Sequence, residues 1–282
     1  MGTSPFSVTC THPTMNPTDP SHNAGRALTL LAPLLEGRRR VAAPQGESGG
    51  CISRYEVAGE PTLYGKSGRG SVAEDITAEF VRLRWLARRV PCPTVHGFAA
   101  VDDEAMLLTT AMPGRSAWEM LTHDGTRGEA IAAAVGSFLR SMHALPVEDC
   151  PFDASVVVRV AAARYRVESG LVDESDFADA YAGWSAREIL QDVEGALPLV
   201  TERVVTHGDF SLGNIMVDGA EVTGIIDVGR VGVADPYQDL AILHENLEEF
   251  GPAVQAAMWR AYGVTDPDPA RLRLHLQLDE LF

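Results

Sequence analysis

The chain has 282 residues, of which 45% are apolar and 22% charged, a composition typical of a soluble globular protein with a sizeable core. Its 39 acidic and 23 basic residues give a net charge of −16, which argues against a nucleic-acid partner and favours a cationic one. No apolar run approaches the roughly 18 residues of a membrane span, and the N-terminus lacks a secretory pattern. We therefore expect a cytoplasmic protein that binds no membrane.

The four cysteines, Cys10, Cys51, Cys92 and Cys150, are scattered without metal-ligand spacing. Without a secretory signal, they are expected to be free thiols. Residues 1–25 are rich in Thr, Pro, Ser, Asn and His and show no period, which indicates a disordered tail or an extension from an upstream start. Leucines at helical spacing over 26–35 then predict a short helix.

Residues 45–66 have the pattern of a strand, a glycine-rich turn and a second strand. The turn, Gly46-Glu47-Ser48-Gly49-Gly50, offers its N–H groups and the Ser48 hydroxyl to phosphates. By itself this pattern fits any tight hairpin. Lys66 makes it more informative, because a kinase needs a lysine on a strand to hold the α- and β-phosphates of its nucleotide.

The helix predicted over 72–89 must supply the carboxylate that holds Lys66. Glu79 is the first candidate and Glu74 the fallback. The segment 59–67 resembles a P-loop, but five residues separate its glycines where that motif requires four. Lys66 also ends a strand pattern rather than opening a helix, so we exclude a P-loop.

Two further strands are predicted over 94–99 and 105–110, followed by a hinge between lobes at 109–114. Beyond the hinge, apolar residues at i, i+3, i+4 spacing predict a buried helix over 129–142. Another helix is expected over 154–170.

An acidic segment follows, with Asp173, Glu174, Asp176 and Asp179 close together. Taken alone, these acids fit a solvated surface helix as well as a binding site for a cationic ligand.

The most informative segment is 204–217, where an apolar strand leads into His207-Gly208-Asp209 and a second apolar strand follows Asn214. Asp218-Gly219 then sits where a two-residue hairpin turn belongs, since Gly adopts the positive φ that such a turn demands. The hairpin should return the chain to Asp227 beside Asn214. Asp209, Asn214 and Asp227 are therefore expected to converge.

This trio suits phosphoryl transfer, which needs a carboxylate to accept the proton of the attacking hydroxyl and oxygen ligands for Mg²⁺. Its order matches a protein-kinase catalytic loop and metal-binding Asp, with His-Gly-Asp in place of His-Arg-Asp and Asp-Val-Gly in place of Asp-Phe-Gly. In protein kinases, the missing Arg is the residue that interacts with a phosphorylated activation loop. The pattern thus indicates a constitutively active small-molecule kinase, whereas a simple Asx-rich turn would not need the whole spaced set.

Several ordered segments together resemble the aminoglycoside 3′-phosphotransferases. They are 207–214, 226–235, 237–241 and the terminal Leu278-Asp279-Glu280-Leu281-Phe282, with shorter matches at 150–153 and 168–173. The resemblance runs from about residue 46 to the last residue. It implies an α+β, bilobal protein-kinase-like fold, with a mostly β N-terminal lobe over 26–111 and a mostly helical C-terminal lobe over 112–282.

The resemblance also implies roles for individual residues. The catalytic set would be Asp209, Asn214, Asp227 and Lys66, with Mg²⁺ held by Asn214 and Asp227. Nucleotide contacts would come from Ser48, Lys66, Glu79, Thr109 and Ala111. The acceptor would be held by Asp173, Asp176, Asp179, Arg230, Glu249, Asp279, Glu280 and Phe282, because carboxylates attract and orient ammonium groups.

The implied reaction uses ATP, or GTP, with Mg²⁺ to phosphorylate the 3′-hydroxyl of aminoglycosides such as kanamycin and neomycin, which confers antibiotic resistance. A monomer or dimer is expected. One alternative is a kinase of another small alcohol, such as a macrolide, choline or a sugar amine. Another is a silent nucleotide-binding module, against which the intact catalytic set argues. One departure from relatives concerns the acceptor pocket: His244-Glu245-Asn246 stands where they commonly carry an Arg-Asp pair.

Overall fold

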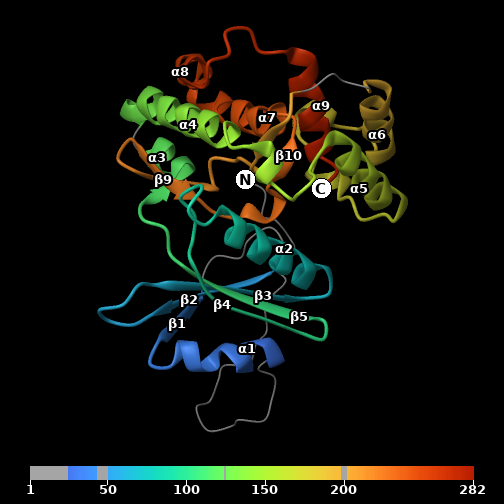
Figure 1. Ribbon diagram of the computed structural model, residues 1–282. Helices are drawn as coiled ribbons and strands as arrows, with labels where there is room; N and C mark the ends of the chain where they lie inside the picture. The colour runs from blue at the N-terminus through green and yellow to red at the C-terminus, as the bar shows by residue number, and fades with distance from the viewer. Residues whose placement is uncertain (1–24, 43–49, 124, 198–201) are drawn as a thin grey trace. The chain divides into compact units, whose positions relative to one another are not determined.

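The computed structural model describes residues 25–42, 50–123, 125–197 and 202–282 (Figure 1). Residues 1–24 of the predicted tail, with Cys10, and residues 46–49 of the glycine-rich turn, with Ser48, lie outside the described residues. The chain divides into two compact units, one comprising the part up to Val81 together with Thr94–Ala111, the other Arg82–Pro93 together with Met112–Phe282.

The first unit is built on an antiparallel five-stranded sheet in the order β1-β2-β3-β5-β4. Its strands are β1 (Arg39–Ala42), β2 (Cys51–Glu56), β3 (Leu63–Arg69), β4 (Val95–Val101) and β5 (Glu104–Thr110). Helix α1 (Arg26–Leu31), followed by a 3₁₀ turn at Ala32–Leu35, lies against this sheet and buries Ala27 and Leu31 with Leu63, Met106 and Leu108 (Figure 1). The leucine spacing near residue 30 thus predicts the face that α1 buries.

Strand β3 extends further than predicted. Lys66 does not end its strand, because Ser67, Gly68 and Arg69 continue the pairing with β5. Helix α2 (Ser71–Leu86) begins two residues after Arg69, close to the predicted helix start.

The second unit is mostly helical. Its helices are α3 (Ala117–His123), α4 (Gly128–His143), α5 (Val156–Glu168), α6 (Ala186–Gly195), α7 (Tyr237–Asn246), α8 (Pro252–Tyr262) and α9 (Pro269–Asp279). The predicted apolar face of α4 is buried through Ile131, Val135 and Leu139. A Cβ at Gly136 would lie 2.5 Å from the carbonyl oxygen of Met258 in α8, so this glycine permits the close approach of two helices.

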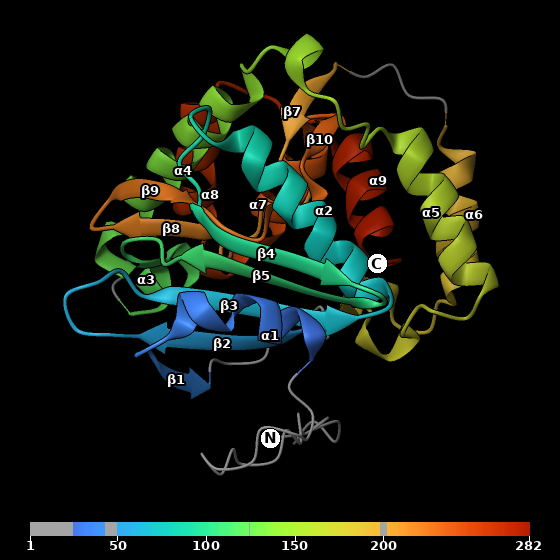
Figure 2. The same ribbon diagram turned by 60° about the horizontal axis from the view of Figure 1, so that its bottom comes forward.

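Helices α5, α6 and α9 lie side by side (Figure 2) and share one apolar core that includes Val160, Ile189 and Leu278. Between α5 and α6, the acidic segment forms two 3₁₀ turns, Glu174–Asp176 and Asp179–Tyr181. It is therefore not the surface helix that was the alternative to a binding site.

Short strands position the central loop of this unit. Strands β7 (Val204–Thr206) and β10 (Gly232–Ala234) pair with each other, and β6 (Arg115–Ser116), β8 (Ile215–Asp218) and β9 (Glu221–Ile225) form a second small sheet. The predicted hairpin is present, but its turn lies one residue later than expected. Asp218 pairs with Glu221, so Gly219 and Ala220 make the turn, and Gly219 adopts a φ of +63°.

Residues 82–93, expected in the N-terminal lobe, belong to the second unit. Specific contacts explain this: Arg82 Nε donates to the Val231 oxygen at 2.7 Å, and Trp85 Nε1 donates to the Asp149 oxygen at 2.8 Å. The Pro91 oxygen also accepts from the Ile225 N–H at 3.0 Å. The end of α2 is thus tied to the segments that surround the central loop.

No helix in the described ranges is long and apolar enough to cross a membrane. Cys51, Cys92 and Cys150 are free thiols, as predicted. Burial raises the pKa of Cys92 to about 11, so this thiol stays protonated and unreactive near neutral pH.

Candidate active site

Asp209 and Asn214 meet in the loop between β7 and β8. Asn214 Nδ2 donates to both the backbone oxygen and Oδ2 of Asp209, each at 3.1 Å. These bonds use both amide hydrogens, which leaves Asn214 Oδ1 as the end of the side chain that can meet a cation. They also orient the Asp209 carboxylate, as a group that accepts a proton from a substrate hydroxyl requires.

Asp227 follows β9 and is linked to the same loop. The Ile226 N–H donates to the Asn214 backbone oxygen at 2.9 Å, so Asp227 comes directly after a backbone pairing with Asn214. Its own backbone is left-handed, with φ 55° and ψ 53°, a conformation uncommon outside glycine and frequent at functional sites. The structure thus brings the predicted trio into one connected segment.

The trio offers the oxygen donors that Mg²⁺ prefers, an amide oxygen from Asn214 and a carboxylate from Asp227. Among the described residues, no cluster of three or more His, Cys, Asp or Glu side chains has metal-binding geometry. In phosphoryl-transfer enzymes, Mg²⁺ is usually held by one or two protein side chains together with water and phosphate oxygens, which Asn214 and Asp227 would fit.

A buried carboxylate from α7 anchors this loop. Asp239 accepts hydrogen bonds from the backbone N–H groups of His207 and Gly208, each at 2.7 Å, and His143 Nε2 lies 3.0 Å from the same carboxylate. The Tyr262 hydroxyl in turn lies 2.8 Å from His143 Nδ1. Burial opposes the charge of Asp239, but the hydrogen bond and charge of His143, with a further contribution from His207, lower its pKa below the ordinary value.

Asp239 was not predicted as a site residue, although it lies in one of the segments that carry the resemblance. Its neighbours Leu240, Ala241 and Leu243 are fully buried. A charged residue within such an apolar helix is the signal that points to a structural or functional partner.

The backbone geometry also explains why a glycine stands between His207 and Asp209. Gly208 has a φ of +89°, and a Cβ there would lie 2.5 Å from the Arg230 oxygen and 2.7 Å from the Arg230 Cβ. An arginine at this position would require the 3₁₀ turn Val228–Arg230 to move. Gly208 is therefore dictated by close backbone packing in this chain.

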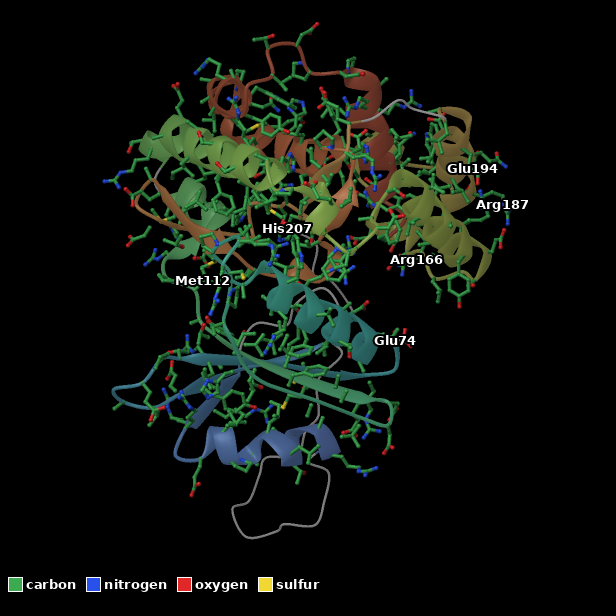
Figure 3. The ribbon with its side chains drawn as sticks, in the orientation of Figure 1. Glu74, Met112, Arg166, Arg187, Glu194 and His207 are labelled. Carbon is green, nitrogen blue, oxygen red and sulfur yellow. The ribbon has the colours of Figure 1, made fainter. Side chains whose placement is uncertain are left out.

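Lys66 in the first unit forms the predicted ion pair. Its Nζ lies 3.1 Å from Glu79 Oε2, and the two side chains are only 16% and 11% exposed. Glu74, the fallback partner, is exposed near the start of α2 (Figure 3). The Lys66–Glu79 pair fixes the position of the ammonium group, as expected of a phosphate-binding lysine.

Thr109 and Ala111, predicted to contact the adenine, lie at the end of the same sheet. Thr109 pairs with Tyr64 of β3 and Val95 of β4. The Ala111 N–H donates to the Thr62 oxygen at 2.9 Å, so this donor already has an acceptor within the protein.

A cavity of about 360 Å³ in the second unit collects most of the predicted acceptor residues. Its charged lining consists of Asp173, Asp176, Glu245, Asp279, Glu280 and Arg166, and Phe282 also faces it. Glu245 was not predicted as a site residue. Three predicted residues lie outside the lining: Asp179 is exposed at the start of a 3₁₀ turn, Glu249 is exposed beyond the end of α7, and Arg230 ends the 3₁₀ turn that follows Asp227.

Arginines fix the wall of this cavity. Arg166 of α5, labelled in Figure 3, donates to the backbone oxygens of Leu171, Leu281 and Phe282 at 2.8 to 3.1 Å. Arg159 Nη2 and Arg230 Nη1 lie 3.6 and 3.8 Å from Asp279 Oδ1. Burial nevertheless raises the pKa of Asp279 above its ordinary value, and it does the same for Glu280.

Residues 48–275 match the model of the phosphotransferase enzyme family. The chain belongs to this family. It is 47% identical to an aminoglycoside 3′-phosphotransferase of Escherichia coli over 238 residues, which cover 84% of the chain and 88% of the relative. It is 36% identical to the enzyme of that name from Streptomyces fradiae, over 86% of the chain and 94% of the relative.

Solved structures of phosphotransferases agree with these matches. The crystal structure of aminoglycoside-3′-phosphotransferase of type VIII has a TM-score of 0.82 and 35% identity, covering 91% of this chain and 98% of that one. Aminoglycoside phosphotransferase APH(3″)-Id of Streptomyces rimosus, in complex with ADP and streptomycin, has a TM-score of 0.70 and 28% identity, covering 90% and 98%. The predicted resemblance and the α+β fold class are confirmed.

Proposed function

We propose that this phosphotransferase transfers the γ-phosphoryl group of ATP to the 3′-hydroxyl of an aminoglycoside. The observation that carries the proposal is a carboxylate-lined cavity in the same unit as the connected Asp209, Asn214 and Asp227 segment. The names of the relatives give the acceptor class and the 3′ position. The ADP complex of a structural neighbour favours ATP over GTP.

In this reaction, Asp209 accepts the proton of the acceptor hydroxyl and aims its oxygen at the γ-phosphorus. Asn214 and Asp227 would hold Mg²⁺, which neutralises the phosphate charge when it is bound. Lys66, held by Glu79, would contact the α- and β-phosphates, with Ser48 covering them and Thr109 and Ala111 at the adenine. Because the reaction consumes ATP, we expect the enzyme to act in the cytoplasm. We expect a monomer or dimer.

The cavity would orient the acceptor. An aminoglycoside carries several ammonium groups, and the carboxylates of Asp173, Asp176, Asp279 and Glu280 can each accept hydrogen bonds from them. Phe282 lines the cavity beside Asp279, and Arg230, outside the lining, lies 3.8 Å from Asp279 Oδ1. Because positioning supplies most of the catalysis in phosphoryl transfer, these contacts would decide which hydroxyl reacts.

The test is to incubate the protein with ATP, Mg²⁺ and kanamycin and to look by mass spectrometry for the gain of one phosphoryl group. Tobramycin, which lacks the 3′-hydroxyl, should remain unmodified and should inhibit kanamycin phosphorylation competitively. Phosphorylation of tobramycin at a comparable rate would contradict the 3′ assignment. Phosphorylation of a macrolide or choline but not of kanamycin would favour the kinase of another small alcohol.

A further inference from the structure

Arg159, in the first turn of α5, is a buried cation whose terminal N–H groups are not used within the protein. Its side chain is only 8% exposed, and Nη1 and Nη2 have no hydrogen-bond partner among the described residues. Its ion-pair partner in α9, Asp279 Oδ1, lies 3.6 Å from Nη2, which is too far for a hydrogen bond. Because burying a guanidinium is costly, its presence here needs a specific reason.

Arg159 lies behind two residues that line the acceptor cavity. Asp279 is its ion-pair partner, and its guanidinium carbon is 5.2 Å from the centre of the Phe282 ring. Both of these residues line the cavity, whereas Arg159 does not. Helices α5 and α9 also share an apolar core (Figure 2). Arg159 is thus placed to act on a bound acceptor through the residues in front of it, without touching the acceptor itself.

Asp279 Oδ1 joins Arg159 to the catalytic loop through a second arginine. Arg230 Nη1 lies 3.8 Å from the same oxygen. The backbone of Arg230 packs closely against the loop, since a Cβ at Gly208 would lie 2.5 Å from the Arg230 oxygen. Gly208 directly precedes Asp209. One carboxylate oxygen of α9 therefore lies between an arginine of α5 and an arginine that contacts the loop.

The charge of Arg159 acts at both ends of this connection. Burial lowers the pKa of Arg159, and the carboxylates of Asp279, Asp239 and Asp209 oppose this shift. An arginine in a protein keeps its proton, so Arg159 is a permanent cation. It attracts the carboxylate at the end of α9 as well as those of the catalytic loop and its anchor.

We propose that Arg159 is a positioning residue of the phosphotransfer reaction, which holds Asp279 from behind and thereby fixes the end of α9 relative to the catalytic loop. The inference rests on the proposed function, since it concerns the acceptor of that reaction. A displaced end of α9 would misalign the acceptor hydroxyl with the γ-phosphate. Loss of Arg159 should therefore lower kcat and not only raise the acceptor KM.

The experiment compares Arg159→Met and Arg159→Lys with the matched variant Arg164→Met. Arg164 lies on the same helix, but its side chain is 49% exposed and pairs with Glu194. We expect Arg159→Met to lower kcat about ten- to a hundredfold and to leave the ATP KM unchanged. Arg159→Lys should recover part of this loss, because it keeps the charge but not the planar fork of donors. Arg164→Met should change kcat less than about twofold.

A double-mutant cycle with Asp279→Asn tests the route of the effect. If Arg159 acts through Asp279, Arg159→Met should lower kcat less than about threefold in the Asp279→Asn background. Equal losses of kcat in the two backgrounds would overturn the inference. If Arg159→Met did not fold, the same cycle with Arg159→Lys would give the answer.

Thermal unfolding separates positioning from folding. The kinetics are measured well below the unfolding midpoint of each variant, so that unfolded protein does not count as a loss of kcat. A lower midpoint with unchanged kcat and acceptor KM would give Arg159 a structural role only and would also overturn the inference. If wild type phosphorylated no aminoglycoside, the proposed function itself would fail, which is a distinct result.

Discussion

Two carboxylates of the second unit, Asp239 behind the catalytic loop and Glu245 in the acceptor cavity, differ in whether the protein itself satisfies them. Asp239 behind the loop is fully buried and meets two backbone N–H groups and His143. Glu245 in the cavity is engaged by none of the described residues. Accordingly, the pKa of Asp239 is lowered while the pKa of Glu245 is raised.

This difference separates the two tasks of the site. The loop is organised by the protein itself, so its geometry exists before any substrate binds, as preorganised catalysis requires. In the cavity, the charge of Glu245 remains available, so that part of its electrostatic cost is removed only when a cationic ligand arrives. Changes in the loop should therefore affect turnover or stability, and changes in the cavity should affect the acceptor KM.

The largest effect is expected at the loop, for Asp209→Ala. Turnover should fall by about 10²- to 10⁴-fold, the usual contribution of a general base, while ATP affinity and thermal stability stay close to wild type. Steady-state kinetics and a nucleotide titration check this. A variant that kept more than a tenth of the wild-type kcat would show that Asp209 does not have this role.

Asp239→Asn should come next, with its main effect on stability. The amide oxygen can replace only one of the two carboxylate oxygens that accept from His207 and Gly208, so one of these buried N–H groups faces a donor. Losing one partner of a buried charged network costs about 3–5 kcal/mol. Because the pKa of Asp239 is lowered in the fold, its contribution is present above the ordinary Asp pKa of about 3.9 and is lost as the pH falls through the folded-state value. Urea unfolding at several pH values tests this, with the exposed Asp266→Asn as the control.

Glu280→Gln should produce a smaller effect confined to the acceptor. The amide oxygen can still accept from the Ala178 N–H, so the fold is preserved while one charge is lost. The acceptor KM should rise about tenfold at low salt, and less at high salt because screening weakens exposed charge pairs. Glu194→Gln, on the surface of α6 beside Arg164, should leave the KM unchanged. An equal change of the acceptor KM in the two variants would mean that Glu280 has only a structural role.

The smallest effect is expected for the stability of Glu245→Gln, and its sign is opposite to that of Asp239→Asn. Because the folded-state pKa of Glu245 is raised, its ionised form opposes folding, so the variant should be as stable as wild type or slightly more stable, by less than about 1 kcal/mol. The gain should be full above that raised pKa and should vanish below the ordinary Glu pKa of about 4.3. A clear loss of stability at neutral pH would mean that Glu245 has a structural partner.

The sequence by itself determined the parts of the site that depend on short spacing. Asp209, Asn214 and Asp227 are brought together by one loop and one hairpin, so a turn signal and two apolar strands are enough to predict their association. Lys66 and Glu79 lie on consecutive elements, and their pairing follows from a strand leading into a helix. The terminal acids were identified by the family resemblance, which depends on the order of residues.

Only the tertiary structure decided which distant side chains share an environment. Asp239 contacts the catalytic loop because α7 packs beneath it, and Glu245 rather than Asp179 or Glu249 lines the cavity because of where α7 and the 3₁₀ turns end. Residues 82–93 belong to the second unit through contacts with β9, with Val231 just before β10, and with the segment before α5. Periodicity along a chain indicates which face of a helix or strand is apolar. The segment that packs against this face can lie far away in the sequence. The burial and the pKa of a charged group on that face therefore depend on the tertiary structure.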